Sequence, residues 1–325
     1  MAKWDKEYLK LCRKILTEGV RVKNRTGIDT IKIPSYKMTF DLSDNTVPIV
    51  TGKKTGVKTL ISELLWMLQG DMFLKDILKD NVHIWTEWKF KRWVNSSEYD
   101  GPKFPSDWTT RKDTDEEFNK IYNEEIKRFE QLILEDKITN TDLTQYKYMY
   151  GYNWKYYPII NGNTITYKDQ LKEIIHTIKN NPESRRNIID SYCKPTVHLA
   201  DLPSCIHTLQ FIVVGDKLNL DLVQRSADSF LGVPFDIAEY AILLHIISAI
   251  TGYTPGELNY ETHDTHIYLD HIEVAKQYLE QDRYDLPSIK FNSDLYEKDI
   301  RTITKCDFEI INYKCSNAIR ASIAI

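Results

Sequence analysis

The sequence has little of what marks a secreted, membrane-bound or nucleic-acid-binding protein. Its first residues contain no signal-peptide hydrophobic region, and we find no apolar run long enough to span a membrane. The formal net charge is −4, whereas a general nucleic-acid binder usually has a strong basic excess. These absences predict a cytoplasmic protein that has neither a membrane nor DNA as a partner.

Cysteine is also scarce, and its arrangement argues against two kinds of site. The five cysteines are scattered, odd in number and form no C-x-x-C pair, which is typical of free thiols in a reducing cytoplasm. Three histidines gather at His263, His266 and His271. Their spacing matches neither the helical H-E-x-x-H motif nor a zinc finger, so we expect no metal site.

No stretch rich in proline, glycine or serine divides the 325 residues, so one domain with an insertion fits as well as two domains. The insertion is expected at about residues 90–142, which are rich in charge and poor in aliphatic side chains. Helices are predicted at 4–20, 57–69, 115–135, 168–180 and 237–251. Strands are predicted at 28–51, 207–214 and 218–224 and in the remainder after 251. This irregular mixture predicts an α+β fold.

Two side chains have the chemistry of catalytic groups, and each also has a plain structural interpretation. Cys205 precedes a predicted strand. A cysteine nucleophile must be available as the thiolate, which nearby arginines stabilise, but a free cysteine is more often a small buried hydrophobe. Glu63 lies in an apolar helix. A partly buried glutamate can act as a proton shuttle, or it can simply be a buried, hydrogen-bonded carboxylate.

Other side chains fit the binding of a flat, phosphorylated ligand. Guanidinium groups bind phosphate oxygens in pairs, although a single arginine is more often a solvated surface residue. The candidates are Arg25, Arg185, Arg186 and Arg225. Trp85 and Trp88 could form an aromatic wall, with core packing as the default alternative.

Taken in order, these segments resemble the thymidylate synthase family over essentially the whole chain. The resembling segments are Asn24–Gly27, Glu63–Asp71, His83–Trp88, Tyr150–Gly151, Ser184–Arg186, Cys205, Gln224–Asp228, Asp264–Tyr268 and the C-terminal Ser322–Ile325. The resemblance implies a layered mixed β-sheet with flanking helices and a homodimer formed through the sheet. It also implies 5,10-methylenetetrahydrofolate as co-substrate, a pyrimidine nucleoside monophosphate as substrate, and a place in nucleotide biosynthesis.

The resemblance further implies a role for each matched residue. The catalytic group is Cys205, Glu63, Asp236, Tyr150 and Arg225. The nucleotide is held by Arg25, Arg185, Arg186, Gln224, Ser226, Asp228, His266 and Tyr268, with Arg185 and Arg186 reaching across to the partner subunit's site. The folate is faced by Lys53, Trp85, Trp88, Leu202, Asp228, Gly232 and, in a C-terminal flap, Ala324.

Three positions depart from the family pattern. Ile206 stands where a histidine usually follows the nucleophile, and Ser204 stands where a proline usually precedes it. Asp236 stands where the pyrimidine-binding signature normally has asparagine. Within this family, an aspartate at that place distinguishes deoxycytidylate hydroxymethylases and deoxycytidylate methylases.

Hydrogen-bonding chemistry explains why Asp236 should select cytosine. Uracil presents an N3–H donor and an O4 acceptor, which an amide answers; cytosine reverses both, and a neutral carboxylic acid answers that pair. The alternative is a helix cap, because Asp236-Ile237-Ala238-Glu239 resembles a capping box. Asparagine caps a helix about as well as aspartate, so capping alone favours neither residue.

We therefore expect one-carbon transfer from the folate to C5 of a cytidylate, deoxycytidylate before cytidylate, through a covalent bond between Cys205 and C6. Water as the last nucleophile gives a 5-hydroxymethyl product, which we place first, and hydride gives a 5-methyl product. The alternatives are an ordinary thymidylate synthase acting on dUMP, a non-catalytic nucleotide- or RNA-binding relative, and a cysteine hydrolase.

Overall fold

The computed structural model describes residues 3–24 and 27–321, with side chains from Lys6 onward. Its centre is a mixed sheet whose strands follow the order β1-β2-β9-β7-β6-β5, with β8 beside β9. The strands β7 and β8 run parallel to β9, and the other neighbours are antiparallel. The strands are β1 (Val20–Val22), β2 (Thr30–Asp41), β5 (Ile188–Asp190), β6 (Ile206–Val214), β7 (Lys217–Gln224), β8 (Ala227–Asp228) and β9 (Thr254–Tyr268). The expected α+β fold with a mixed sheet is confirmed.

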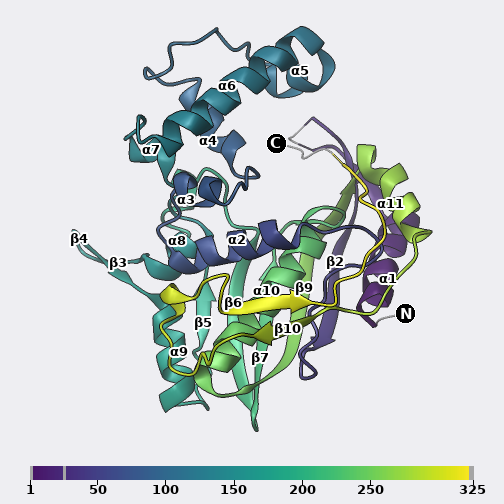
Figure 1. Cartoon of the computed structure of the whole chain (residues 1–325), viewed down its shortest axis with the longest axis vertical. Coiled ribbons are helices and arrows are strands. Elements are labelled where there is room, and N and C mark those ends of the chain that lie inside the picture. The colour runs from purple at the N-terminus through teal and green to yellow at the C-terminus, as the bar shows by residue number, and fades with distance from the viewer. Residues whose placement is uncertain (1–2, 25–26, 322–325) are drawn as a thin grey trace.

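Helices cover the sheet in layers (Figure 1). The long helix α10 (Gly232–Thr251) packs on β7 and β9, and α2 (Val57–Gln69) packs on α10. Around them lie α1 (Lys3–Glu18) against β2 and α9 (Gln170–Asn180) against α10. By length and apolar composition α10 could cross a membrane, which corrects the expectation that no segment is long enough. Because 83% of its apolar window is buried inside the fold, α10 is a core helix here.

Apart from α6, the remaining elements are short. The helices are α3 (Leu74–Lys79), α4 (Thr86–Trp93), α5 (Trp108–Thr114), α6 (Glu116–Leu134), α7 (Thr141–Thr144), α8 (Tyr150–Lys155) and α11 (Ile272–Leu279). The hairpins are β3 (Tyr157–Asn161) with β4 (Thr164–Lys168) and β10 (Ser288–Phe291) with β11 (Phe308–Ile311). Three turns are 3₁₀ helices: η1 (Val197–Leu199), η2 (Leu269–His271) and η3 (Ile300–Thr302).

The charged segment at about 90–142 folds into an upper lobe, which we define as α4 to α7 (Figure 1). Its interior is aromatic. The ring of Phe90 lies 5.4 Å from that of Phe104, 5.8 Å from that of Trp108 and 5.9 Å from that of Phe129, measured between centroids. A segment that is poor in aliphatic residues therefore still buries apolar surface, because aromatic rings supply it.

Several boundaries differ from the sequence-based expectation; within 28–51, which was expected to be strand, the strand is β2 (Thr30–Asp41). Helix α10 begins at Gly232 and not at Ile237, because Pro234 is tolerated in the first turn of a helix, where its missing N–H has no partner to lose. Asp236 therefore lies one turn inside the helix, and its interpretation as a helix cap is wrong. Residues after 268 are not only strands, since α11 precedes β10.

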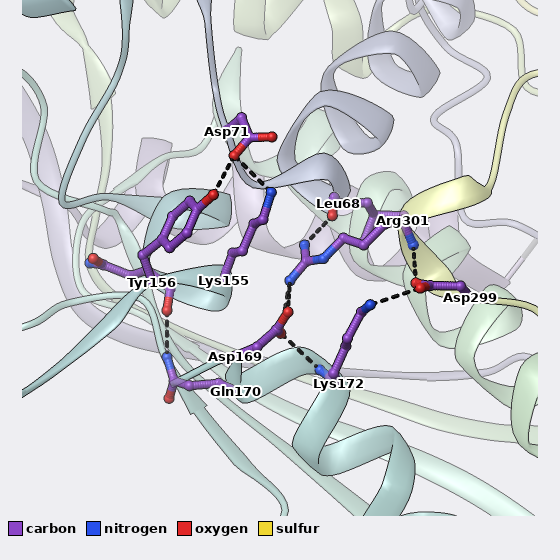
Figure 2. Close-up of polar contacts among 10 residues, drawn as sticks. Leu68, Asp71, Lys155, Tyr156, Asp169, Gln170, Lys172, Asp299 and Arg301 are labelled. Atoms are coloured by element: carbon purple, nitrogen blue, oxygen red, sulfur yellow. Dashed lines mark hydrogen bonds and ion pairs between the residues drawn. The ribbon is translucent and has the colours of Figure 1, made fainter. Parts of the chain in front are cut away.

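A polar network holds the C-terminal end of α2 against the rest of the molecule (Figure 2). Arg301 donates to the backbone oxygen of Leu68 through Nη1 and to Asp169 through Nη2, the latter at 2.8 Å. Asp71, just beyond α2, accepts from Lys155 Nζ at 2.7 Å. Charge-assisted bonds of this kind fix geometry as well as adding stability. The network thus fixes the position of α2, the helix that carries the predicted proton shuttle.

Candidate active site

One cavity of about 1360 Å³ collects most of the side chains that the sequence singled out. It lies where α2, α8, α10 and the upper lobe meet the loops that precede β6 and follow β7. The predicted site residues that line it are Glu63, Trp85, Trp88, Tyr150, Leu202, Cys205, Gln224, Arg225, Ser226, Asp228, Gly232, Asp236, His266 and Tyr268. Residues far apart in the sequence thus share one pocket, as a composite active site requires.

Some predicted residues do not line this cavity. Arg185 and Arg186 are exposed and lie just before β5. Lys53 is buried; its ammonium donates to the backbone oxygen of Phe230 and lies 4.0 Å from the centre of the Phe230 ring. Burial lowers the pKa of Lys53 to about 8. Lys53 therefore stabilises the loop between β8 and α10 through its contacts with Phe230.

Two predicted residues lie outside the described residues. These are Arg25, in the expected phosphate loop, and Ala324, in the expected C-terminal flap Ser322–Ile325. The neighbouring Ala321 is described and lines the cavity.

Backbone hydrogen bonds fix Cys205 at the cavity wall. Its N–H donates to Tyr150 Oη at 2.9 Å, and the N–H of Tyr150 donates to Ser204 Oγ at 2.8 Å. Arg225 donates from Nε to the backbone oxygen of Ser204 at 2.9 Å and from Nη2 to the backbone oxygen of Pro203 at 2.7 Å. Ser204 therefore acts through its hydroxyl where the family usually has proline. The guanidinium of Arg225 thus places a positive charge on the two residues that precede Cys205.

The helix α8 brings Tyr150 to this loop because a glycine follows it. Gly151 packs so tightly on α2 that an added Cβ would lie 2.0 Å from the backbone oxygen of Met67. A glycine is needed for so close an approach of two backbones. The spacing of α8 and α2 is thereby set, and with it the distance between the Cys205 loop and the wall formed by α2.

Polar groups suited to a nucleotide lie next to Cys205. Arg225 stacks over Tyr192, with its guanidinium carbon 5.6 Å from the ring centre. His266 Nδ1 is 2.7 Å from the backbone oxygen of Asp264, to which it donates, so Nε2 remains for a ligand. The His266 and Tyr268 rings meet edge to face, 5.2 Å apart. A guanidinium, an imidazole and a phenol thus line one part of the cavity, as binding of phosphate and sugar requires.

Asp236 ends a chain of hydrogen bonds that begins in the core. Tyr260, through its hydroxyl, donates to Gln224 Oε1, which turns the Gln224 amide so that Nε2 donates to Asp236 Oδ2 at 2.8 Å. Burial, and then the nearby Glu63 carboxyl, raise the pKa of Asp236 to about 8. Both effects favour the neutral acid of Asp236.

Glu63 is part of a group of acidic side chains. Trp85 Nε1 donates to Glu63 Oε1 at 2.6 Å. Burial raises the pKa of Glu63 to about 7, although hydrogen bonds from Trp85 and Glu239 act in the opposite direction. Glu239, which the sequence analysis did not select, lines the same cavity and is buried. It stands three residues after Asp236, on the same face of α10, and that spacing within an otherwise apolar helix was the available signal.

An aromatic wall closes one side of the cavity. The Trp85 and Trp88 rings are 5.3 Å apart, and Leu202 and Phe235 add apolar surface to the lining. Flat apolar walls beside a few polar groups are typical of pockets for heterocyclic ligands. The wall and the cavity volume fit a folate lying beside a nucleotide.

Besides Trp88, further residues of the upper lobe line the cavity, and the sequence did not predict them. Lining residues from this side are Lys91, Arg92, Asn95, Ser96, Asp142 and Leu143. At the base of the lobe, the buried ammonium of Lys89 donates to Asp201 Oδ2 at 2.7 Å and to the backbone oxygen of Asp142 at 2.9 Å. Asp201 belongs to the loop that leads to Cys205, so the lobe is tied to that loop.

No group of three or more His, Cys, Asp or Glu side chains within 3–24 and 27–321 is arranged to hold a metal ion. The cluster of three histidines is divided by the fold. His263 is exposed and pairs with Glu261, His266 lines the cavity, and His271 is buried in η2.

Comparison with known proteins agrees with this geometry. The family model for thymidylate synthase matches residues 6–325. The chain is 38% identical over 325 residues to the thymidylate synthase of Oenococcus oeni (strain ATCC BAA-331 / PSU-1), and the alignment covers 100% of both chains. The chain therefore belongs to the thymidylate synthase family of one-carbon transferases, which act on a pyrimidine nucleotide with methylenetetrahydrofolate as co-substrate.

Proposed function

We propose that this enzyme transfers a one-carbon unit to C5 of a cytidylate, in the first place deoxycytidylate, and that the product is the 5-hydroxymethyl nucleotide. One observation carries the choice of base. Asp236, at the position where the family signature has asparagine, lines the cavity and has a pKa raised to about 8 by burial. A neutral carboxylic acid has one donor and one acceptor, which is what the N3 and N4 edge of cytosine needs.

The alternative base, uracil, fits this acid poorly. An ionised Asp236 would oppose an oxygen to O4 of uracil, and a neutral Asp236 opposes its O–H to N3–H unless its proton moves to the oxygen that faces O4. Each buried mismatch costs about 1–3 kcal/mol. Gln224 cannot correct the mismatch, because Tyr260 holds its amide in one orientation. A site of this kind discriminates strongly against a ligand whose hydrogen-bonding edge is reversed.

The side chains around the base support covalent catalysis. Cys205, beside the Arg225 guanidinium, adds to C6 and makes C5 nucleophilic. Asp236 keeps its proton on the N3 edge and stabilises the charge that develops there. Arg225 and Ser226 bind the phosphate, together with Arg25 and with Arg185 and Arg186 from the partner subunit, and His266 and Tyr268 bind the sugar. The folate, held against Trp85 and Trp88, supplies the one-carbon unit.

The last step decides between two products. Once C5 has lost its proton and the one-carbon unit has separated from the folate, an exocyclic methylene remains on the ring. Water adds to this carbon, its proton passes to a carboxylate, and the C6–S bond to Cys205 breaks. The Glu63 carboxylate offers such a proton acceptor in the cavity wall, which favours hydroxymethylation. The Trp85–Trp88 wall, which excludes water, favours hydride transfer and a 5-methyl product instead.

A second candidate function is ordinary thymidylate formation from dUMP. It is favoured by one specific observation, the 38% identity over both full chains to a protein named thymidylate synthase. Under this alternative, the enzyme tolerates Asp236 without reading cytosine.

Mass analysis of products separates these functions. The enzyme is incubated with methylenetetrahydrofolate and, separately, with dCMP, CMP or dUMP. A modified cytidylate supports the proposal, and its mass distinguishes hydroxymethyl from methyl. Conversion of dUMP alone contradicts the cytosine proposal and leaves the second candidate.

We also propose a homodimer formed through the sheet, as the family resemblance implies. Gln210 Nε2 donates to the backbone oxygen of Arg185 at 3.4 Å, so the Arg185–Arg186 pair lies beside β6, where Gln210 and Ile212 are only half-buried. A partner sheet packed on this face would bring the two arginines near the partner's cavity. Analytical ultracentrifugation tests the assembly. A cytoplasmic location and the status of residues 90–142 as an insertion remain predictions.

A further inference from the structure

A buried carboxyl on α10 has no role in the mechanism so far. Glu239 is only 3% exposed and lines the cavity. Its Oε1 has no hydrogen-bond partner among the residues that the structure describes. Burying an ionised carboxylate is costly unless it is paired, so such a group is normally protonated or functional.

The groups that face Glu239 come from several elements. From α2, the Glu63 carboxyl is within hydrogen-bonding reach. From α10 itself, Asp236 lies one turn earlier, and Tyr240 is adjacent. From α8, the phenol of Tyr150 lines the same cavity. The charges that act on Glu239 most strongly are those of Glu63 and Asp236, both acidic, so its neighbourhood favours the protonated acid.

Two buried carboxyls in contact do not both ionise; they share a proton. Burial and the neighbouring carboxyls raise the pKa of Glu239 well above its ordinary value. Trp85 Nε1 donates to Glu63 Oε1 and so favours the ionised form of Glu63, whereas Glu239 Oε1 has no hydrogen-bond partner among the described residues. The shared proton therefore resides mainly on Glu239, and Glu63 is the partner that can be ionised.

We propose that Glu239 is a positioning residue for Glu63: its O–H donates to the Glu63 carboxylate and keeps that buried group available as a proton acceptor during the reaction at C5. Trp85 provides the second donor to the same carboxylate, at 2.6 Å. With neither donor, burial alone would hold Glu63 in the protonated form, unable to accept a proton. This inference rests on one-carbon transfer at C5 and is independent of which base the enzyme reads.

The test compares wild type, Glu239→Ala and Glu239→Gln by tritium release from C5. The substrates are 5-tritiated dCMP and 5-tritiated dUMP, each with methylenetetrahydrofolate, over a range of pH. In Glu239→Ala the acid limb of the pH profile is expected to move upward by about one to two pH units, because a hydrogen bond to a charged group is lost. In Glu239→Gln the acid limb stays near that of wild type, because the amide N–H still donates to Glu63.

A matched control separates this effect from general damage to the core. Asp307 is also a buried carboxyl, but it pairs with Lys298 outside the cavity lining. Asp307→Asn is expected to lower thermal stability and to leave the position of the acid limb unchanged. Infrared difference spectra of wild type against Glu239→Gln add a readout that needs no turnover, since the band of a buried protonated carboxyl should disappear at pH 7.

Two results would overturn the proposal. The first is an acid limb that lies at the same pH in wild type and Glu239→Ala, or one that moves from its wild-type position by the same amount in Glu239→Ala and Glu239→Gln. The other, decisive if Glu239→Ala does not fold, is an unchanged carboxyl band in Glu239→Gln. Tritium release from dUMP alone would contradict the cytosine proposal, and the pH comparison would then be completed on dUMP.

Discussion

Replacing Asp236 by asparagine is expected to transfer the preference of this enzyme from cytosine to uracil. The two side chains have nearly the same volume, so the change leaves no cavity. Gln224 Nε2 donates to Asp236 Oδ2 at 2.8 Å, and Tyr260 fixes the direction of that bond. Since Gln224 can only donate to position 236, the new amide keeps its oxygen towards Gln224 and its NH₂ at the place of Oδ1, in a single orientation. The uracil pairing of the family implies that this orientation matches N3–H and O4.

The magnitude follows from the two hydrogen bonds that reverse. At about 1–3 kcal/mol for each buried mismatch, the pair amounts to about 2–6 kcal/mol. This corresponds to a change of about 30-fold to about 10⁴-fold in the ratio of kcat/KM for dCMP to kcat/KM for dUMP. The expected change combines a loss for dCMP with a gain for dUMP.

The assay measures kcat/KM for both nucleotides in wild type and in Asp236→Asn. A matched control is Asp228→Asn, which makes the same chemical change in the same cavity. Asp228 accepts hydrogen bonds from the backbone N–H groups of Phe230 at 3.0 Å and Leu231 at 3.2 Å, and an asparagine oxygen can also accept them. The control should therefore leave the base ratio unchanged. A wild-type enzyme that prefers dUMP, or an Asp236→Asn ratio within threefold of wild type, would refute the reasoning.

Three further predictions concern pH, the nucleophile and the anchoring of α2. The pKa of Asp236 is about 8 in the folded protein and ordinarily 3.8, so between these values the folded state holds a proton that the unfolded chain has lost. Stability should thus fall as pH rises from about 4 to about 8, and Asp236→Asn should flatten this dependence in urea unfolding. Cys205→Ser should reduce tritium release from C5 by at least about 10³-fold while nucleotide binding, followed by calorimetry, persists. Arg301→Ala should destabilise the fold by about 2–4 kcal/mol, because Asp169 and the end of α2 lose their partner (Figure 2). Lys172→Ala removes a half-exposed ion pair of the same network and should cost about 0.5 kcal/mol. Equal losses in the two variants would contradict the assigned role of Arg301.

Local patterns predicted the local elements well. The helix over 57–69 ends as expected, because Gly70 adopts the left-handed conformation, with φ of 78°, that terminates helices. The turn at Gly215 joins β6 and β7 as the alternating pattern predicts. The predicted start of α10 at Ile237 was wrong because Asp236 has the chemistry of a helix cap, and only the tertiary structure shows that its side chain pairs with Gln224 instead.

The site was predictable where a family motif marks it and not where it depends on contacts between distant segments. Glu239 belongs to none of the family's motifs, and its importance depends on Glu63, which lies on another helix. The ion pair of Lys89 with Asp201 joins residues 112 positions apart, so no local pattern reveals it. Tyr260 likewise reaches Gln224 only because β9 and β7 are neighbours in the sheet.

The buried ammonium of Lys89 has a consequence for the continuity of the chain. Lys89 lies near the start of the upper lobe and Asp142 near its end, and Lys89 Nζ donates to both the backbone oxygen of Asp142 and the Asp201 carboxylate. Noncovalent contacts therefore hold together the two points at which the chain enters and leaves the lobe. A cut in an exposed turn of the lobe would leave both new ends attached to this base. The position of the loop before Cys205 thus depends on contacts made at Lys89 and not on an unbroken chain through the lobe.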